Sequence, residues 1–311
     1  MSDPKVAPLP RNTMAIRRVL EKRQVKVAFQ PVVDLRTKKV FAYEALARPA
    51  SQDFDGPLAL FGAAVQHACT GELGRMVREI AIAECPSYPL FLNVHPAELN
   101  EKWVVQPNDP IFEHAEDVYL EITEGVPLSH FRLCQSILNE VRGRGVHLVV
   151  DDLGAGYSNL KYIADLHPRV VKLDRGLIEG LVRDTRMFKL VSAIVVMCTD
   201  LDAAVVAEGI ETVDELEAVI AAGAHFGQGY LLARPANPPP PVVWPKKGGD
   251  SVAPRILHRE PINSLIPHPI DRNVLIGDRR SPVPPSATAP APRRATVPPL
   301  SRPYTKIPGR R

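Results

Sequence analysis

A chain of 311 residues, 45% of them hydrophobic, can hold one large α/β domain or two ordinary ones, and it is too apolar to be disordered throughout. Charge divides the chain unevenly. Residues 241–311 carry 13 Lys and Arg against 4 Asp and Glu, a net charge of +9, whereas residues 1–240 carry 25 against 31, a net charge of −6. The formal net charge of +3 therefore conceals an acidic body and a basic tail.

Proline-rich, weakly periodic sequence marks the basic tail. Residues 241–311 are expected to be disordered or to form polyproline II. A plain solvated tail is the simplest interpretation. Electrostatic attachment to an anionic partner and docking to a proline-binding module are the alternatives. Residues 1–11 are expected to be a flexible N-terminus, which leaves residues 12–240 for the folded domain.

The chain shows no pattern of a secreted or membrane protein. No signal peptide is expected at the N-terminus, and the most apolar long window, residues 190–207, is interrupted by Asp200 and Asp202 and is too short to span a bilayer. The four cysteines are single, without the paired spacing of a zinc site or disulfide framework. We therefore expect a cytoplasmic protein.

Strand-like and helix-like patterns alternate along the predicted domain. An amphipathic helix is expected first, at residues 14–24. Apolar, β-branched runs then predict strands at 27–33, 40–46, 90–94, 118–122, 147–150, 170–173, 203–207 and 226–232. Helical periodicity lies between most of them, at 58–85, 129–145, 159–166, 177–199 and 213–222.

The order of these elements predicts an α/β fold, a (β/α)8 TIM-like barrel with an irregular start. A tight turn at 36–39 favours an antiparallel hairpin for the first two strands, because a parallel pair needs a longer crossover. No clear helix is predicted between residues 96 and 117. A run of four prolines at 238–241 excludes a long last helix, so the segment 242–244 is expected to cap the barrel instead.

Polar residues follow or interrupt the predicted strands, at the end where barrel enzymes place their chemistry. Most are carboxylates, and packing them together requires a cation. Oxygen ligands without histidine favour Mg²⁺ or Mn²⁺, and Asp151 could bridge two such ions. The Asp151–Asp152 pair alone favours a solvated turn that caps a helix; the set as a whole predicts a site. Its members are Gln30, Glu44, Asn93, Glu121, Glu124, Asp151, Asp152, Lys172, Asp174, Glu208, Glu211 and Gln228.

The residues at these positions resemble those of a known family. The motifs are FQPVVD at 29–34, EALAR at 44–48, LNV at 92–94, LEITE at 120–124, DDLGAGYS at 151–158, VKLD at 171–174, AEGIET at 207–212 and GQGY at 227–230. In this order they resemble the EAL-domain cyclic di-GMP phosphodiesterases over residues 12–236. The resemblance implies hydrolysis of cyclic di-GMP to linear pGpG with two Mg²⁺ or Mn²⁺ ions, by a homodimer.

The resemblance also implies roles for individual residues. Lys172 matches the lysine that holds or deprotonates the attacking water, Glu124 the glutamate that steadies the loop after Asp152, and Gln228 a residue near the water and metals. Gln30 and Arg48 match substrate contacts, and Glu211 a residue that supports the substrate site. The residues that match metal ligands are Glu44, Asn93, Glu121 and Asp151 for one ion, and Asp151, Asp152 and Glu208 for the other.

Departures from the family pattern cluster in the loop after Asp152. Leu153, Ala155 and Asn159 stand where phenylalanine, threonine and serine are usual. None is a ligand position, so these changes are expected to tune loop motion and rate. They leave one alternative function open, a catalytically silent receptor that only binds cyclic di-GMP. Lys161 and Arg175 are interpreted as surface charges, and the histidines as structural or surface residues.

Overall fold

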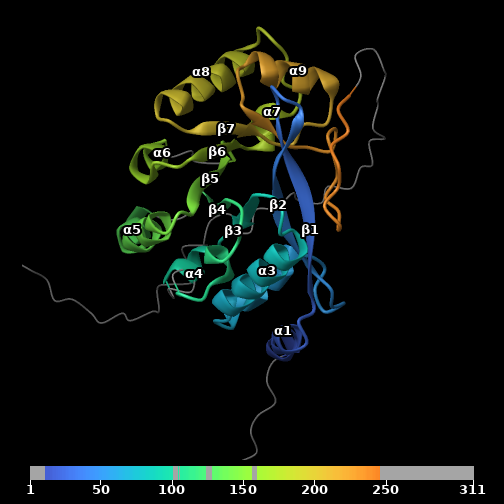
Figure 1. The fold of residues 1–311 in the computed structure, drawn as a ribbon, viewed down its shortest axis with the longest axis vertical. Coiled ribbons are helices and arrows are strands. Elements are labelled where there is room, and N and C mark those ends of the chain that lie inside the picture. The colour runs from blue at the N-terminus through green and yellow to red at the C-terminus, as the bar shows by residue number, and fades with distance from the viewer. Residues whose placement is uncertain (1–10, 101–103, 105, 124–127, 156–159, 246–311) are drawn as a thin grey trace, which may run out of the picture. The chain divides into compact units, whose positions relative to one another are not determined.

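Eight strands close into a barrel in chain order (Figure 1). The computed structural model describes residues 11–100, 104, 106–123, 128–155 and 160–245, which belong to one compact unit. The expected flexible N-terminus, apart from residue 11, and all but the first five residues of the expected tail lie outside them. The strands are β1 Val25–Asp34, β2 Lys39–Pro49, β3 Leu90–Asn93, β4 Val118–Thr123, β5 His147–Leu153, β6 Val170–Leu173, β7 Ala204–Ala207 and β8 Phe226–Gly227.

Helices cover the outside of the barrel between the strands. They are α1 Arg11–Glu21, α2 Pro57–Gln66, α3 Thr70–Glu84, α4 Pro96–Asn100, α5 Leu128–Gly143, α6 Lys161–Leu166, α7 Arg175–Ile178, α8 Arg186–Asp200 and α9 Val213–Ala221, with a 3₁₀ helix, η2, at Pro110–Phe112. Between residues 96 and 117, where no clear helix was predicted, the structure contains the short helices α4 and η2. Within the part of the chain that the structure describes, no helix is long and apolar enough to cross a bilayer.

The first strand makes the barrel irregular, as predicted. β1 pairs antiparallel with both of its neighbours, β2 and β8, while the pairs from β2–β3 to β7–β8 are all parallel. The β1–β2 hairpin turns at Asp34, whose Oδ1 accepts hydrogen bonds from the backbone N–H groups of Arg36 (2.8 Å) and Thr37 (2.7 Å). The predicted fold class is confirmed.

Three predicted elements were wrong in extent. The single helix expected at 58–85 is two helices, α2 and α3, and Ala68 between them has a left-handed backbone (φ 51°). The helix expected at 177–199 is the short α7 followed by α8. The strand expected at 226–232 ends at Gly227, because the chain packs against the backbone at Ile210: a Cβ on Gly229 would lie 2.1 Å from the Ile210 carbonyl oxygen.

The C-terminal part of the described chain lies along β1 in place of a last helix. Ala236 and Phe29 exchange backbone hydrogen bonds (2.8 and 3.0 Å), and the Tyr43 hydroxyl donates to the Pro240 carbonyl oxygen (2.8 Å). Val242 and Trp244 are partly buried against the main hydrophobic core. Val242 and Trp244 thus pack against the barrel where the prolines exclude a long helix, while Val243 between them is exposed.

Candidate functional site

Two layers of side chains fill the barrel interior, one above the other. The lower layer, towards the N-terminal ends of the parallel strands, is a separate apolar cluster: Val32, Ala42, Phe91, Tyr119, Val149, Val170 and Val206, with Phe226 packed against it. Side chains two residues apart on a strand point to the same face. The upper layer therefore consists of the residues two positions later in the chain, or two positions earlier on the antiparallel β1: Gln30, Glu44, Asn93, Glu121, Asp151, Lys172, Glu208 and Gln228. One polar residue from each of the eight strands, or just beyond it, thus meets at one end of the barrel.

Lys172 lies at the centre of the acidic residues in this upper layer. Its Nζ is 2.6 Å from Glu121 Oε1, 2.6 Å from Glu208 Oε1, 3.3 Å from Asp151 Oδ1 and 3.5 Å from Glu44 Oε2. Lys172 and Glu121 are each 1% exposed, so water screens these charges little. Four carboxylates from four strands share one buried ammonium group.

Amide side chains complete the ring. Gln228 Nε2 donates hydrogen bonds to Glu44 Oε2 and to Gln30 Oε1 (3.1 Å), and Gln30 Nε2 donates to the Ala233 carbonyl oxygen (3.1 Å). On the other side of Glu44, Asn93 Nδ2 donates to its Oε1 (3.2 Å). Glu44 is therefore held between two amides, which fixes the orientation of its carboxylate.

An irregularity in β5 brings two adjacent aspartates to the same site. In a regular strand, Asp151 and Asp152 would point to opposite faces. The pairing of β5 with β6 shifts between Val150 and Leu153, and Asp152 has a left-handed backbone (φ 58°), which aspartate tolerates better than most residues. As a result, carboxylate oxygens of Asp151, Asp152 and Glu208 all lie within 4.8 Å of one another.

Burial and neighbouring charges raise the pKa values of most of these carboxylates and lower that of Glu44. Burial, together with Asp151 and Glu208, raises the pKa of Asp152 to about 9, and burial and neighbouring carboxylates raise that of Glu208 to about 8 despite Lys172. Burial and Glu44 likewise raise the pKa of Glu121 well above its usual range. For Glu44, burial is outweighed by Lys172 and the two amides, so its pKa is lowered. The single ammonium group of Lys172 therefore does not offset the repulsion among these buried carboxylates.

Unused oxygen atoms indicate what the site can bind. Among the described residues, Glu121 Oε2 and Gln228 Oε1 are buried and accept no hydrogen bond, and Glu121 Oε1 and Asp151 Oδ1 have only the ion pair with Lys172. Buried acceptors without partners are uncommon in native proteins. The donor set is carboxylate and amide oxygen, which suits hard divalent cations such as Mg²⁺ and Mn²⁺. The residues present therefore fit a divalent metal site.

Two other predicted site residues, Arg48 and Glu211, lie outside this ring. Arg48 follows Glu44 by four residues on β2, on the same face, and its Nη1 donates to the Ala47 carbonyl oxygen (2.9 Å). Glu211 pairs with Arg175 instead (Oε1–Nη1, 2.8 Å), and the two side chains are 37% and 34% exposed, in agreement with the interpretation of Arg175 as a surface charge. Glu124 and the loop residue Asn159 lie outside the described residues.

Two further predictions concern residues that are not part of the ring. Asp174, which follows β6, caps α7 through a hydrogen bond from the Gly176 N–H to its Oδ1 (2.8 Å). Lys161 is exposed on α6 and pairs with Asp165, in agreement with its interpretation as a surface charge.

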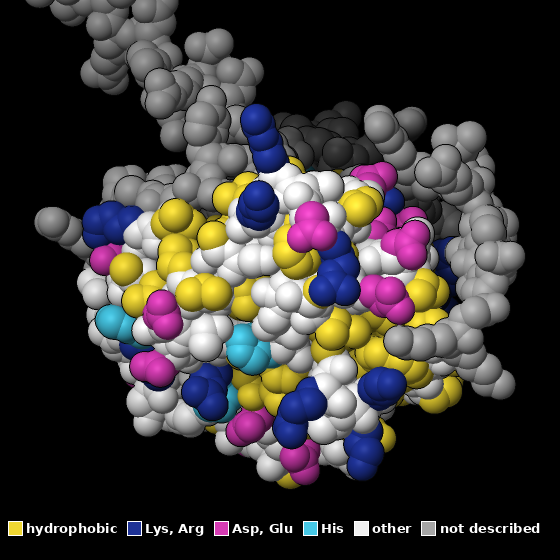
Figure 2. Space-filling model, turned by 90° about the horizontal axis from the view of Figure 1, so that it is seen from above, with side chains coloured by type: hydrophobic (Ala, Val, Ile, Leu, Met, Phe, Trp, Pro, Cys, Tyr) yellow, Lys and Arg dark blue, Asp and Glu magenta, His cyan; other side chains and the backbone are white. Residues whose placement is uncertain are grey.

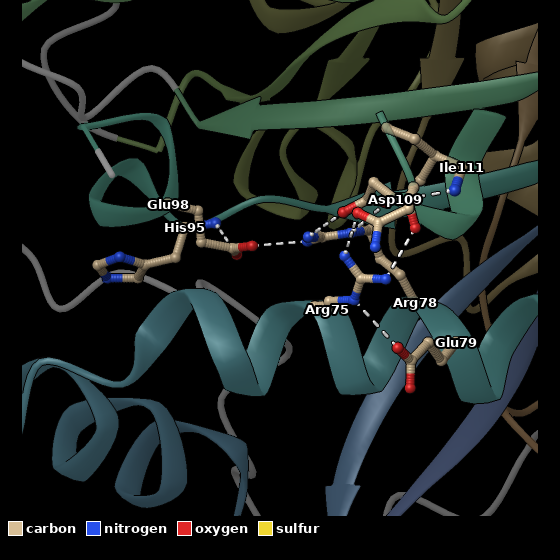
Figure 3. A network of polar contacts seen from close by, with 8 residues as sticks. Arg75, Arg78, Glu79, His95, Glu98, Asp109 and Ile111 are labelled. Carbon is tan, nitrogen blue, oxygen red and sulfur yellow. Dashed lines mark hydrogen bonds and ion pairs between the residues drawn. The ribbon is translucent and has the colours of Figure 1, made fainter. Parts of the chain in front are cut away.

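A second buried ionic cluster, which was not predicted from the sequence, lies beside the site. Arg78 on α3 is 1% exposed and pairs with Glu98 and Asp109, both fully buried (Figure 3). One feature of the sequence could have indicated it: Arg78 follows Val77 in a helix whose neighbouring apolar residues predict that this position is buried. The partners of that arginine lie 20 and 31 residues further along the chain and could not be identified from spacing.

Known proteins are similar to this chain in both sequence and fold. The model of the EAL domain family matches residues 13–235. A cyclic di-GMP phosphodiesterase of Pseudomonas aeruginosa is 29% identical over 225 residues, which are 68% of this chain and 38% of that protein. The chain spans between 28% and 38% of the length of curated relatives that it matches, so those relatives contain further regions.

Solved structures with the same fold carry the ligands that their names state. A manganese and cyclic di-GMP complex of BlrP1 from Klebsiella pneumoniae is 27% identical, with a TM-score of 0.61, over 68% of this chain and 56% of that one. A cyclic di-GMP complex of the MucR phosphodiesterase of Pseudomonas aeruginosa is 27% identical, with a TM-score of 0.64, over 73% of this chain and 98% of that one. With the family match covering most of the chain and the barrel closed as described, this chain belongs to the EAL domain family.

Proposed function

We propose that this chain hydrolyses cyclic di-GMP to linear pGpG with the help of two divalent cations, Mg²⁺ or Mn²⁺. The observation that carries the proposal is the upper layer of the barrel, in which four buried carboxylates surround Lys172 and oxygen atoms remain without partners. Relatives and structural neighbours named for cyclic di-GMP support the choice of substrate.

Two groups of residues would hold the ions. Glu44, Asn93, Glu121 and Asp151 would bind one, and Asp151, Asp152 and Glu208 the other; the close approach of the last three oxygens supports the second group. When bound, the two ions would activate a water molecule and stabilise the charge that develops on the phosphate. The carboxylates with raised pKa values would then ionise at neutral pH, because the cations supply the positive charge that Lys172 alone does not.

Lys172 would hold the attacking water through its ammonium group. Burial lowers the pKa of Lys172, but the four carboxylates outweigh burial and raise it well above the usual range. In the metal-free protein the side chain is therefore protonated and can donate hydrogen bonds. It becomes a base only if positive charge nearby lowers that pKa. Gln228 would orient the water beside Glu44, and Glu124 would steady the loop after Asp152.

Substrate contacts would come from residues at the rim of the ring. Arg48 is partly exposed and lies on the same face of β2 as Glu44, where a guanidinium group suits a phosphate. Gln30, hydrogen-bonded to Gln228, would offer an amide to the dinucleotide. Glu211, held by Arg175, would support this rim.

Turnover of cyclic di-GMP in the presence of Mn²⁺ or Mg²⁺, followed by chromatography, tests the proposal. We expect pGpG from the wild-type protein and none from Glu44→Ala, because the substitution removes a carboxylate that both amides hold in place. Glu79→Ala, which removes a partly exposed glutamate on α3, is the control and should retain activity. Binding of cyclic di-GMP without any product would contradict the proposal and establish the receptor alternative. The altered loop at Leu153 and Ala155 would then be the first candidate for the cause of the lost activity.

We also propose that the protein forms a homodimer through the outer face of α8. Figure 2 shows hydrophobic side chains exposed between charged ones on the side where α8 and α9 lie. Met187, Leu190 and Val196 on α8 are 41%, 48% and 58% exposed, which is a large apolar surface for one helix. A second copy of the same face would bury it, and isologous contacts of this kind are the commonest in soluble oligomers.

Substitution of Leu190 by glutamate should shift the protein from dimer to monomer. Burying a carboxylate at the centre of an apolar interface is costly, so we expect self-association to weaken by at least about tenfold, which corresponds to about 1.4 kcal/mol. Sedimentation equilibrium measures the change. Leu58→Glu, at a residue of α2 that is also exposed, is the control and should leave the dimer intact. A wild-type monomer at all concentrations would refute the proposal.

The partner of the basic tail and the cytoplasmic location stay predictions from the sequence.

A further inference from the structure

A buried ionic cluster outside the candidate metal site joins α3 to the connection between β3 and β4 (Figure 3). Arg78 Nη1 lies 2.6 Å from Glu98 Oε2, while its Nη2 and Nε lie 2.8 and 3.3 Å from the two carboxylate oxygens of Asp109. All three side chains are at most 1% exposed. Replacing such buried pairs by apolar residues is often neutral or stabilising, so fold stability alone does not account for this cluster.

Glu98 links the cluster to the turn that follows β3. Its second oxygen, Oε1, accepts a hydrogen bond from the His95 N–H (3.0 Å), and the Ala97 N–H donates to His95 Nδ1 (3.1 Å). On the other side of the turn, the Val94 N–H donates to the Glu121 carbonyl oxygen (3.1 Å). The backbone from Val94 to Glu98 is thereby fixed at both ends.

Asn93 immediately precedes this turn and faces the candidate metal site. Its Nδ2 donates to Glu44 Oε1 (3.2 Å), so the direction of the Asn93 side chain depends on the backbone that Glu98 holds. Arg78 and Asn93 also line the same small cavity, between α3 and the barrel wall. A continuous path of contacts therefore leads from Arg78 through Glu98 and His95 to Asn93.

A glycine on α3 makes room for Glu98. A Cβ on Gly74, one helical turn before Arg78, would lie 2.2 Å from Glu98 Oε2 and 2.4 Å from its Cδ. Gly74 thus leaves space for the Glu98 carboxylate, and Arg78, one turn later on α3, binds it. Arg75, in contrast, holds the far end of the same connection, through the carbonyl oxygen (2.7 Å) and the side chain (3.1 Å) of Asn108.

We propose that Arg78 is a positioning residue for the metal centre: through Glu98 it fixes the turn that aims Asn93 at the metal. This inference rests on the proposed function only in assuming that Asn93 is a metal ligand. Residues that orient a ligand without touching the metal typically change metal affinity by about 10–100-fold when they are replaced. Because the effect passes through a side chain and a backbone turn, we expect the lower end of that range.

Calorimetric titration of the full chain with Mn²⁺ tests the proposal. Arg78→Lys keeps the charge but loses the planar fork that binds two carboxylates at once, and we expect Mn²⁺ affinity to fall by about tenfold. Glu98→Ala leaves Arg78 paired with Asp109, so the fold is easier to retain, and the same loss is expected. Glu98→Gln keeps an oxygen acceptor for the His95 N–H and should recover part of the affinity. The double variant Arg78→Lys with Glu98→Ala should bind Mn²⁺ no more weakly than either single variant, because both act on one path.

Arg75→Lys is the matched control on the same helix and should bind Mn²⁺ within about twofold of the wild type. Equal loss in this control, unchanged affinity in both the Arg78 and Glu98 variants, or no Mn²⁺ binding by the wild-type protein would each overturn the inference. The same samples are assayed for pGpG. If the wild type binds Mn²⁺ but forms no product, the proposed function fails, while the Mn²⁺ affinities still decide the role of Arg78.

Discussion

Replacement of Lys172 by methionine is expected to lower the turnover of cyclic di-GMP by about 10²–10⁴-fold, the range for a residue that positions or transfers a proton. The same change should destabilise the metal-free protein, because four buried carboxylates lose the ammonium group that lies 2.6 to 3.5 Å from them. Removing one partner of a buried ion pair costs about 3–5 kcal/mol. Methionine nearly matches the length of the lysine stem, so the loss is one of charge and not of volume.

Bound metal should reverse the effect on stability but not the effect on turnover. We expect saturating Mn²⁺ to restore most of the stability of Lys172→Met, since the ions supply the missing positive charge, while product formation stays low. Urea unfolding with a chelator and with Mn²⁺ measures the first effect, and chromatography of pGpG the second. Lys161→Met, at an exposed position on α6, is the control and should change neither. If Lys172→Met hydrolyses cyclic di-GMP at the wild-type rate, the proposed role of the ammonium group is wrong.

The residues that form the ring could be predicted from the sequence, because they follow the two-residue periodicity of side chains along each strand. An apolar residue that points into the barrel is followed two positions later by a polar one on the same face, as with Phe91 and Asn93, or Tyr119 and Glu121. This pattern needs no knowledge of which strands are neighbours. The order of strands and helices then places all such positions at one end of a barrel.

The detailed geometry of the site could not be read in the same way, because it depends on residues far apart in the chain. The left-handed backbone at Asp152 arises where the pairing of β5 with β6 shifts, and a run of two aspartates does not reveal that shift. Similarly, Gln30 and Gln228 lie 198 residues apart, yet a hydrogen bond joins them. One element boundary failed for a related reason: β8 ends at Gly227 because the next residues pack against the backbone at Ile210, far from them in the chain.

Asp152→Asn is expected to stabilise the metal-free protein and to weaken the metal-bound one, two effects of opposite sign from one substitution. The pKa values of Asp152 and Glu208, about 9 and about 8, lie above their ordinary values of 3.8 and 4.5. The native state therefore binds protons more tightly than the unfolded state, so the metal-free protein should lose stability as the pH rises from about 4 to about 9. Asparagine does not ionise, accepts the left-handed backbone, and removes the larger of these two contributions.

At pH 8 with a chelator, we expect Asp152→Asn to be more stable than the wild type by on the order of 1–3 kcal/mol, since solvent screens part of the repulsion at this partly exposed carboxylate. With Mn²⁺ at 100 times its dissociation constant, the wild type should gain about 2.7 kcal/mol, and the variant much less, because one ligand of the second ion has lost its charge. Thermal unfolding with and without Mn²⁺ measures both. Asp202→Asn is a close control, since Asp202 also has a left-handed backbone (φ 59°) but is exposed on the surface. A variant that is less stable without metal, yet gains as much from Mn²⁺ as the wild type, would show that Asp152 is held in place for the fold and not for a cation.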